Sequence, residues 1–410
     1  MNFDYIGLIS LLLVTLLVRK IALKQPSIAL ILYVALGIRI LAIFINHNIF
    51  ILPDGIGDAA RFELKALDMS RGGFVSTIKN YTGFNSFSIS WVIAILYSIF
   101  GQSELMAQSL SLLLGVGTVY LGWIASKKIW DARSANKAGW ALALFPTLIL
   151  YSVLILREVY VCFFLMLALN GIIEWYQKKN LKSLILLLSG FLGAAFFHSA
   201  MIVGLMVFLT VIFLQNMNFF FSNLIKLKIS IKSLIVFLVI FLIIFFIKGI
   251  HFGKIAPIFS PIQNIEKVLV KIKDYDRGTA KYPNWMVPEN EIEIIYKSPF
   301  RILYFVYAPF PWDVDKPSHL VGMIDGLLYI FFSYIIFRNR KNIWSDPVLR
   351  IIFLILLSYI IVFGIGIGNF GTGIRHRSKF VLMFILLAAP LLPKLIFSIK
   401  NNIKKNKTGK

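Results

Sequence analysis

Long runs of apolar residues alternate with short polar segments along almost the whole chain. The runs are about 17 to 25 residues long, the length that an α-helix needs to cross the hydrocarbon core of a bilayer. We therefore predict an all-α polytopic membrane protein with about eleven transmembrane helices. The predicted spans are 5–18, 27–46, 105–125, 137–154, 159–175, 182–197, 200–215, 233–250, 320–337, 349–367 and 379–397.

Composition and charge fix the class and the orientation. Hydrophobic residues make up 59% of the chain and the mean hydropathy is +0.81, which excludes a soluble fold. The net charge of +23 does not indicate nucleic acid as a partner, because the basic residues gather in short loops and in the tail. These segments all fall on one side, which the positive-inside rule makes cytoplasmic: Arg19 to Lys24, Lys127 to Lys137, Lys178 to Lys182, Lys226 to Lys232, Arg338 to Lys341 and Lys400 to Lys410.

Two long loops, 47–104 and 251–319, then lie on the extracytoplasmic side. They divide the chain into a membrane module (1–250) that contains the first loop, the second outer loop (251–319), and C-terminal helices with a basic cytoplasmic tail (320–410). We expect helices that lie on the membrane surface within these loops, at 58–70, 88–100 and 300–308. The localisation that follows is a bacterial inner membrane, crossed many times.

The first outer loop gathers acidic residues directly after an apolar span, in Leu52-Pro-Asp-Gly-Ile-Gly-Asp-Ala-Ala-Arg-Phe-Glu63. A helix from Asp58 to Ser70 places four apolar residues on one face, namely Ala59, Phe62, Ala66 and Met69. Asp54 and Asp58 then lie near its N-terminus. The ordinary explanation for a carboxylate there is helix capping, and it remains open beside a catalytic role.

Nearly all unusual polar residues are extracytoplasmic, whereas lysines dominate inside. Three short outer turns add to the first loop, around Arg157-Glu158, around His198 and at 369–379. Ionisable groups are costly near hydrocarbon, so their repeated occurrence on one face indicates an active site that faces the periplasm or the exterior.

The chain resembles the GT-C superfamily of membrane glycosyltransferases. The resemblance lies in Phe87 to Tyr120, Ser126-Lys-Lys-Ile-Trp-Asp-Ala-Arg133, Ala141 to Ser152 and Leu156-Arg-Glu158, and it covers residues 50–215. Members include protein O-mannosyltransferases and the lipid A aminoarabinose transferase, which take a sugar from a polyprenyl phosphate or pyrophosphate carrier. The resemblance implies an essential acidic residue in the first outer loop, where we prefer Asp58 over Asp54. It implies a second acidic residue at Glu158, in place of the more usual aspartate, and a basic residue at His198.

Chemistry favours the same residues. Transfer from a lipid phosphate needs a base for the acceptor hydroxyl and positive charge for the departing phosphate. The predicted catalytic residues are Asp58, Asp54 and Glu158, and the predicted substrate-binding residues are Arg61, Arg157, His198, Arg375, His376 and Arg377. The ordinary explanations are lipid-headgroup contact for Arg375-His-Arg377 and a satisfied polar role for His198. A divalent cation is left open; Asp274 and Asp276 are the only further hint.

The leading prediction is a glycosyltransferase that uses a polyprenyl-linked sugar in surface polysaccharide or lipopolysaccharide assembly. The alternative is an O-antigen or capsule repeat-unit polymerase, which Arg375-His-Arg377 fits equally well. A transporter or flippase of lipid-linked glycans is a further alternative, disfavoured because charges do not fall mid-span and broken helices are not evident. The expected partners are a polyprenyl-linked sugar or glycan and membrane lipids; contact with other polysaccharide-assembly proteins is left open.

Overall fold

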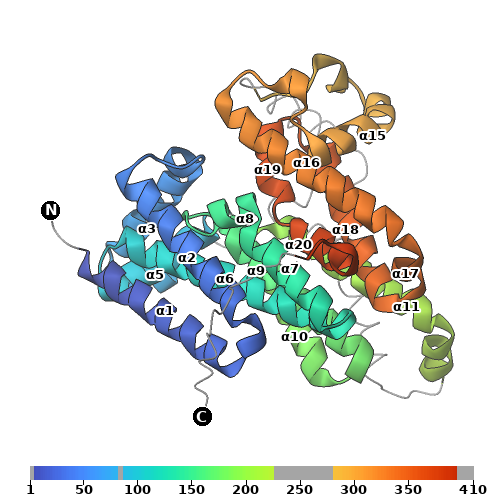
Figure 1. Ribbon diagram of the computed structural model, residues 1–410. Helices are drawn as coiled ribbons and strands as arrows, with labels where there is room; N and C mark the ends of the chain where they lie inside the picture. The colour runs from blue at the N-terminus through green and yellow to red at the C-terminus, as the bar shows by residue number, and fades with distance from the viewer. Residues whose placement is uncertain (1–3, 82–85, 226–279, 395–410) are drawn as a thin grey trace, which may run out of the picture.

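The computed structural model describes residues 4–81, 86–225 and 280–394, and this part of the chain is almost entirely helical (Figure 1). Within it, six helices are long and apolar enough to cross a membrane. They are α1 (Tyr5–Lys24), α2 (Pro26–Asn48), α6 (Glu104–Ile129), α9 (Arg157–Lys178), α16 (Pro317–Arg338) and α18 (Pro347–Gly366). Each coincides with a predicted span, so the prediction of an all-α membrane protein is confirmed.

Other predicted spans are shorter or lie elsewhere. The predicted spans 182–197 and 200–215 are helices, α10 (Leu181–Phe197) and α11 (Ile202–Ile225). The predicted span 379–397 begins as α20 (Val381–Ala388) and a 3-10 turn, Ala389–Leu391. The predicted span 233–250, Asp274, Asp276 and the basic tail lie outside the described residues, so the number of eleven spans stays a prediction.

The predicted span 137–154 is broken at Pro146. The structure has α7 (Ala132–Leu144) and α8 (Pro146–Tyr151) in its place, with an extended Phe145 between them (φ −66°, ψ 121°). Proline has no N–H and pushes the preceding residue away from helical angles, so the helix ends at this point. The prediction of one continuous helix over 137–154 was therefore wrong, and the chain leads from α8 through 152–156 to the N-terminus of α9.

Charges inside the membrane helices correct a second expectation. Arg39 lies in the middle of α2, and Asp325 lies in α16; both are buried. Arg39 Nε donates to Ser152 Oγ at 2.8 Å, and its NH1 reaches Ala143 O at 3.2 Å. These mid-span charges are satisfied within the protein, as such charges must be in hydrocarbon.

The first outer loop folds into three short helices, α3 (Ala60–Ser70), α4 (Gly73–Lys79) and α5 (Ser88–Phe100). The predicted apolar stripe is confirmed, because Ala59, Phe62, Ala66 and Met69 are all buried. Ser90 Oγ donates to Phe62 O at 2.8 Å and fixes α5 against α3. The loop is thus a packed unit that holds 54–58 beside the bundle.

The helices α9 and α10 pack closely against each other. Gly171 faces the backbone of Leu187, and Gly190 faces the backbone of Ala168, so a methyl group at either glycine would overlap the other helix. Small residues at facing positions let two helices approach closely. In a bilayer, van der Waals contact then holds the helices together, because lipid tails remove the hydrophobic driving force. This contact fixes the position of α9, which carries part of the candidate site at its N-terminus.

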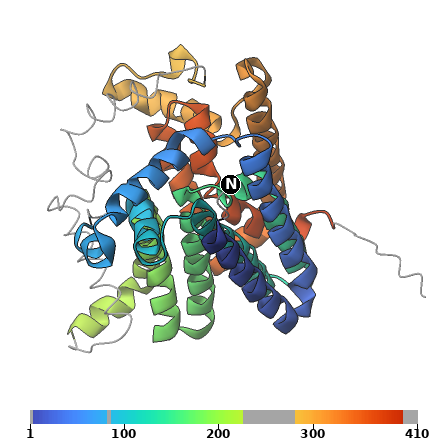
Figure 2. The same cartoon turned by 90° about the vertical axis from the view of Figure 1, so that its left-hand side faces the viewer.

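The C-terminal part adds α15 (Glu291–Tyr307), α17 (Arg340–Ser345) and α19 (Phe370–Arg377). α15 is longer than the predicted surface helix 300–308. Backbone hydrogen bonds join Tyr282 N to Gly368 O (2.9 Å) and Phe370 N to Ala280 O (2.8 Å). Arg301 is buried and donates to Ile367 O at 2.8 Å, just beyond the end of α18. These contacts hold the turn before α19 at the end of the molecule where α15 lies, as both views show (Figure 1, Figure 2).

Candidate active site

Three segments far apart in the sequence meet at Arg375. They are the loop after α2 (54–58), the N-terminus of α9 (157–158) and the end of α19 (375–379). Arg375 forms an ion pair with Asp58, and its Nε lies 3.0 Å from Glu158 Oε1. Burial lowers the pKa of the Arg375 guanidinium, but the Glu158 and Asp58 carboxylates outweigh burial and raise it, so the charge is permanent. The predicted convergence of these residues is therefore seen in the structure.

Glu158 is the buried centre of the cluster. Its Oε1 lies 3.0 Å from Arg375 Nε, 3.3 Å from Lys379 Nζ and 3.8 Å from Arg157 Nε. A carboxylate removed from water is stable only with such compensation, and its place in the first turn of a helix also favours negative charge. Side-chain exposure rises from 0% at Glu158 through 13% at Arg375 to 42% at Asp58, so the cluster runs from the interior to the surface.

Lys379 belongs to the cluster although the sequence analysis placed it only at the start of a span. Its side chain is fully buried, and its Nζ lies 3.3 Å from Glu158 and 2.9 Å from His376 Nδ1. Burial lowers the pKa of Lys379 to about 8, although the charge of Glu158 opposes the change. The sequence could have indicated this position, because Lys379 comes four residues after Arg375 and residues four apart share one face of a helix.

The two predicted histidines lie together at the edge of this cluster. The rings of His198 and His376 meet edge to face with centroids 5.2 Å apart, and Phe363 packs against both. Burial, followed by the charge of Lys379, lowers the pKa of His376 well below its usual value. His376 is therefore a neutral acceptor for the Lys379 ammonium group near neutral pH.

Asp54 lies four residues before Asp58 in the same loop. It adopts a left-handed backbone conformation (φ 66°), which aspartate tolerates better than most residues. The Tyr151 side chain at the end of α8 lies near its carboxyl group. Partial desolvation raises the pKa of Asp54, while the positive charge of Arg375 lowers it. Both predicted acids of the loop, Asp54 and Asp58, thus lie close to Arg375.

Arg61 and Arg377, both predicted to bind substrate, do not join the cluster. The Arg61 guanidinium lies over the Phe87 ring at 5.4 Å, between α3 and the start of α5. Arg377 lies two residues from Arg375 and so points to the other side of α19. It is buried, with its Nε 2.9 Å from Asp325 Oδ2 and its NH1 3.0 Å from Val306 O. Arg377 joins α19 to α15 and α16, which leaves its guanidinium no free edge for a substrate phosphate.

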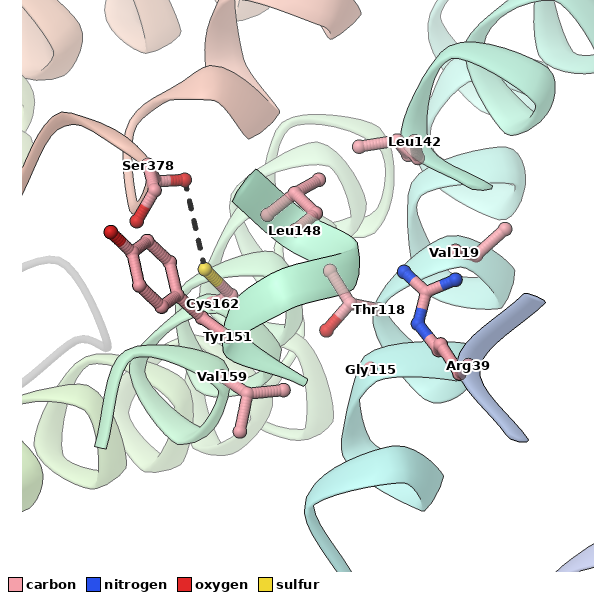
Figure 3. A pocket seen from close by; sticks show the side chains of 10 residues that line it. All are labelled: Arg39, Gly115, Thr118, Val119, Leu142, Leu148, Tyr151, Val159, Cys162 and Ser378. Atoms are coloured by element: carbon pink, nitrogen blue, oxygen red, sulfur yellow. Dashed lines mark hydrogen bonds between the residues drawn. The ribbon is translucent and has the colours of Figure 1, made fainter. Parts of the chain in front are cut away.

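A narrow cavity lies next to the cluster, because it is lined by Val159 and Ser378, which adjoin Glu158 and Lys379 in the chain (Figure 3). Its walls include Arg39, Tyr151, Val159, Cys162 and Ser378, and its volume is about 10 Å³. A space of this size holds one water molecule at most. A sugar ring does not fit in this space, and we expect a substrate to approach the cluster from its exposed side at Asp58.

The residues of the cluster are not arranged to hold a metal ion. In the described ranges, no group of three or more histidine, cysteine, aspartate or glutamate side chains has the geometry of a metal site. At Glu158 the protein supplies its own cations, Arg157, Arg375 and Lys379. A catalytic role for a divalent cation therefore stays open.

The chain matches no protein-family model, no curated protein and no solved structure. The resemblance to GT-C glycosyltransferases accordingly remains a prediction from the sequence. The chemistry of the site has to be argued from its own residues.

Proposed function

We propose that this protein is an integral-membrane glycosyltransferase. It transfers sugar from a polyprenyl phosphate or pyrophosphate carrier on the extracytoplasmic face, in the assembly of surface polysaccharide or lipopolysaccharide. The observation that carries the proposal is the Asp58–Arg375–Glu158 array, in which a half-exposed carboxylate lies beside a group of buried cations.

The cations suit the departing phosphate. Arg375 presents a planar group of N–H donors, which matches phosphate oxygens, and Arg157 and Lys379 add charge close by. In a site shielded from water such charges stabilise the transition state more strongly than in bulk solvent. Glu158 is fully buried between them, so its proposed role is to hold the cations in place rather than to take a proton.

The base is proposed to be Asp58. A phosphate that binds Arg375 competes with Asp58 for the guanidinium and frees the carboxylate as the donor arrives. Asp58 then takes the proton of the acceptor hydroxyl, whose oxygen forms a bond to the anomeric carbon. The bond from that carbon to the phosphate oxygen breaks, and its electron pair leaves with the carrier phosphate.

Asp54 is the second candidate for the base. Its raised pKa suits proton transfer, because a base works best when its pKa lies near the working pH. Its position near Tyr151 also supports a structural role. Separate substitution of the two aspartates distinguishes these roles.

The second candidate function is a repeat-unit polymerase, which joins two lipid-linked glycans. It is favoured by the origin of two of the cations: Arg375 and Lys379 come from the C-terminal part, whereas the GT-C resemblance ends at residue 215. Both functions use a lipid-linked donor. Both also need a base for the acceptor hydroxyl and positive charge for the departing phosphate.

Purified protein in nanodiscs tests the proposal. It receives a polyprenyl-linked monosaccharide, or separately a lipid-linked oligosaccharide repeat unit, and the length of the product is followed. Addition of a single sugar supports the transferase, and a ladder of products supports the polymerase. Protein that moves the lipid between leaflets without forming a new glycosidic bond contradicts both.

A further inference from the structure

A large apolar cavity lies apart from the candidate site, between α15, α16, α17, α18 and α20. Its volume is about 470 Å³, within the range of pockets that hold small ligands. The walls are mostly aliphatic and aromatic and include Ile302, Val306, Ile336, Phe353, Leu356 and Ile360. An apolar chain would fit such a lining, whereas a sugar would leave its hydroxyl groups without partners.

One end of this cavity is basic. A second cavity of about 550 Å³ shares Arg340 and Trp344 with the first and adds Lys341 and Ser345. The Arg340 guanidinium lies over the Phe337 ring at 4.3 Å, and Arg340 and Lys341 are both exposed. The cavity therefore has an apolar interior and a cationic mouth.

The charge at the mouth is not neutralised by its neighbours in sequence. The stretch 338–350 contains four basic residues and one acid: Arg338, Arg340, Lys341, Arg350 and Asp346. Asp346 Oδ1 accepts from the backbone N–H groups of Val348 (2.8 Å) and Leu349 (2.9 Å), so it caps α18. The mouth consequently favours an anion.

The mouth lies at the C-terminal end of α16, whereas the candidate site lies beside the middle of this helix. Asp325 in α16 pairs with Arg377, next to the site, whereas α17 with Arg340 follows the C-terminal end of the helix at Arg338 (Figure 1). The thirteen residues from Asp325 to Arg338 correspond to roughly 20 Å along the axis. By the distribution of basic residues, this end is the one predicted to be cytoplasmic.

We propose that this cavity binds an anionic phospholipid of the cytoplasmic leaflet. One acyl chain fills the apolar interior, and the headgroup phosphate lies between Arg340 and Lys341, beside Trp344. Basic residues at the cytoplasmic ends of membrane helices commonly recognise such headgroups. The carrier lipid is a different occupant, because its phosphate has to reach Arg375 in α19, away from the basic mouth. The inference is thus independent of the proposed function.

Native mass spectrometry of the full-length protein tests this site. Protein in mild detergent is titrated with phosphatidylglycerol and, separately, with phosphatidylcholine. The wild type retains phosphatidylglycerol in preference. Arg340→Gln and Lys341→Gln each weaken that binding about fivefold, the effect of losing about 1 kcal/mol per basic residue near an anionic headgroup.

Arg338→Gln is the matched control, since it removes the same charge from the same helix end but lies over the Tyr334 ring and does not line the cavity. It is expected to change the affinity for phosphatidylglycerol less than twofold. Leu357→Trp places a larger side chain in the cavity and is expected to abolish retention of the lipid without removing a charge. Equal retention of both lipids, or an equal effect of Arg338→Gln and Arg340→Gln, overturns the proposal. Displacement of phosphatidylglycerol by polyprenyl phosphate also overturns it and assigns the cavity to the carrier.

Discussion

Arg375 of α19 forms an ion pair with Asp58, a residue 317 positions earlier in the chain. The same guanidinium reaches Glu158 at the N-terminus of α9. One side chain thus connects the first outer loop, the centre of the bundle and the C-terminal helices. The proposed chemistry depends on this connection, because it places a carboxylate beside the charge that would receive a phosphate.

Replacement of Arg375 tests the proposed phosphate contact. Arg375→Gln removes a preorganised donor from the site, and losses of this kind cost about 10² to 10³ in rate. Arg375→Lys keeps the charge but loses the forked geometry, so an intermediate loss is expected. The measurement is the initial rate of transfer from the lipid-linked donor, together with the melting temperature in detergent.

Arg61→Gln is the matched control for Arg375, because Arg61 comes from the same outer end but stacks on Phe87 outside the cluster. Its activity should stay within twofold of wild type. An equal loss in the two variants would show that the Arg375 cluster has no special part in catalysis.

The Arg377–Asp325 pair is expected to be structural. Arg377→Met leaves the buried Asp325 carboxylate without its partner, and breaking such a pair costs about 3 to 5 kcal/mol. The double variant Arg377→Met with Asp325→Leu leaves no uncompensated charge and should be more stable than Arg377→Met alone. A thermal double-mutant cycle measures the difference. A double variant that is no more stable than Arg377→Met would contradict the pairing as the source of the cost.

The sequence predicted the helices better than the site, and the reason is physical. Apolar runs report membrane crossing directly, and the stripe of Phe62, Ala66 and Met69 follows from helical periodicity. Side-chain direction at 375–379 depends on where α19 begins and ends. Arg375 and Arg377 therefore looked alike in the sequence although they face opposite sides, and Lys379 was counted with the next span.

Other features depend on tertiary contacts that a single sequence does not reveal. Arg61 differs from Arg375 only because Phe87 lies beneath it. Arg301 and Arg39 are buried cations that donate to backbone carbonyl groups, and the sequence does not reveal such partners. The break at Pro146 could have been predicted from the sequence, since a proline inside a helix usually kinks or breaks it.

Lys379 is expected to make stability depend on pH. Its pKa of about 8 in the folded protein lies below the ordinary value of 10.5. Between these values the unfolded chain holds a proton that the folded chain has lost, so stability rises with pH across that window. The gain is on the order of 3 kcal/mol, since the two pKa values differ by about 2.5 and each pKa unit corresponds to about 1.4 kcal/mol.

Thermal unfolding in detergent, followed from pH 8 to pH 10.5, measures this dependence. Lys379→Met should lose the rise, because no group then titrates at that position. A rise of the same size in Lys379→Met would assign the dependence to other groups.

The two ends of the bundle are expected to face opposite sides of the membrane. In a Cys162→Ala background, which removes the one cysteine of the chain, Ile56→Cys and Lys341→Cys provide exposed probes. A membrane-impermeant maleimide added to spheroplasts should label Ile56→Cys at once and Lys341→Cys only after permeabilisation. Labelling of Lys341→Cys in intact spheroplasts would reverse the predicted orientation.

Asp58→Asn tests the central claim most directly. The substitution keeps the size of the side chain but removes the proposed base, and loss of a general base lowers rates about 10² to 10⁴-fold. The measurement is the rate of glycosidic bond formation in nanodiscs with a saturating polyprenyl-linked donor, for wild type, Asp58→Asn, Asp54→Asn and Arg61→Gln. The account predicts at least a hundredfold loss in Asp58→Asn, with the protein still folded and Arg61→Gln unaffected. Wild-type turnover by folded Asp58→Asn would contradict it.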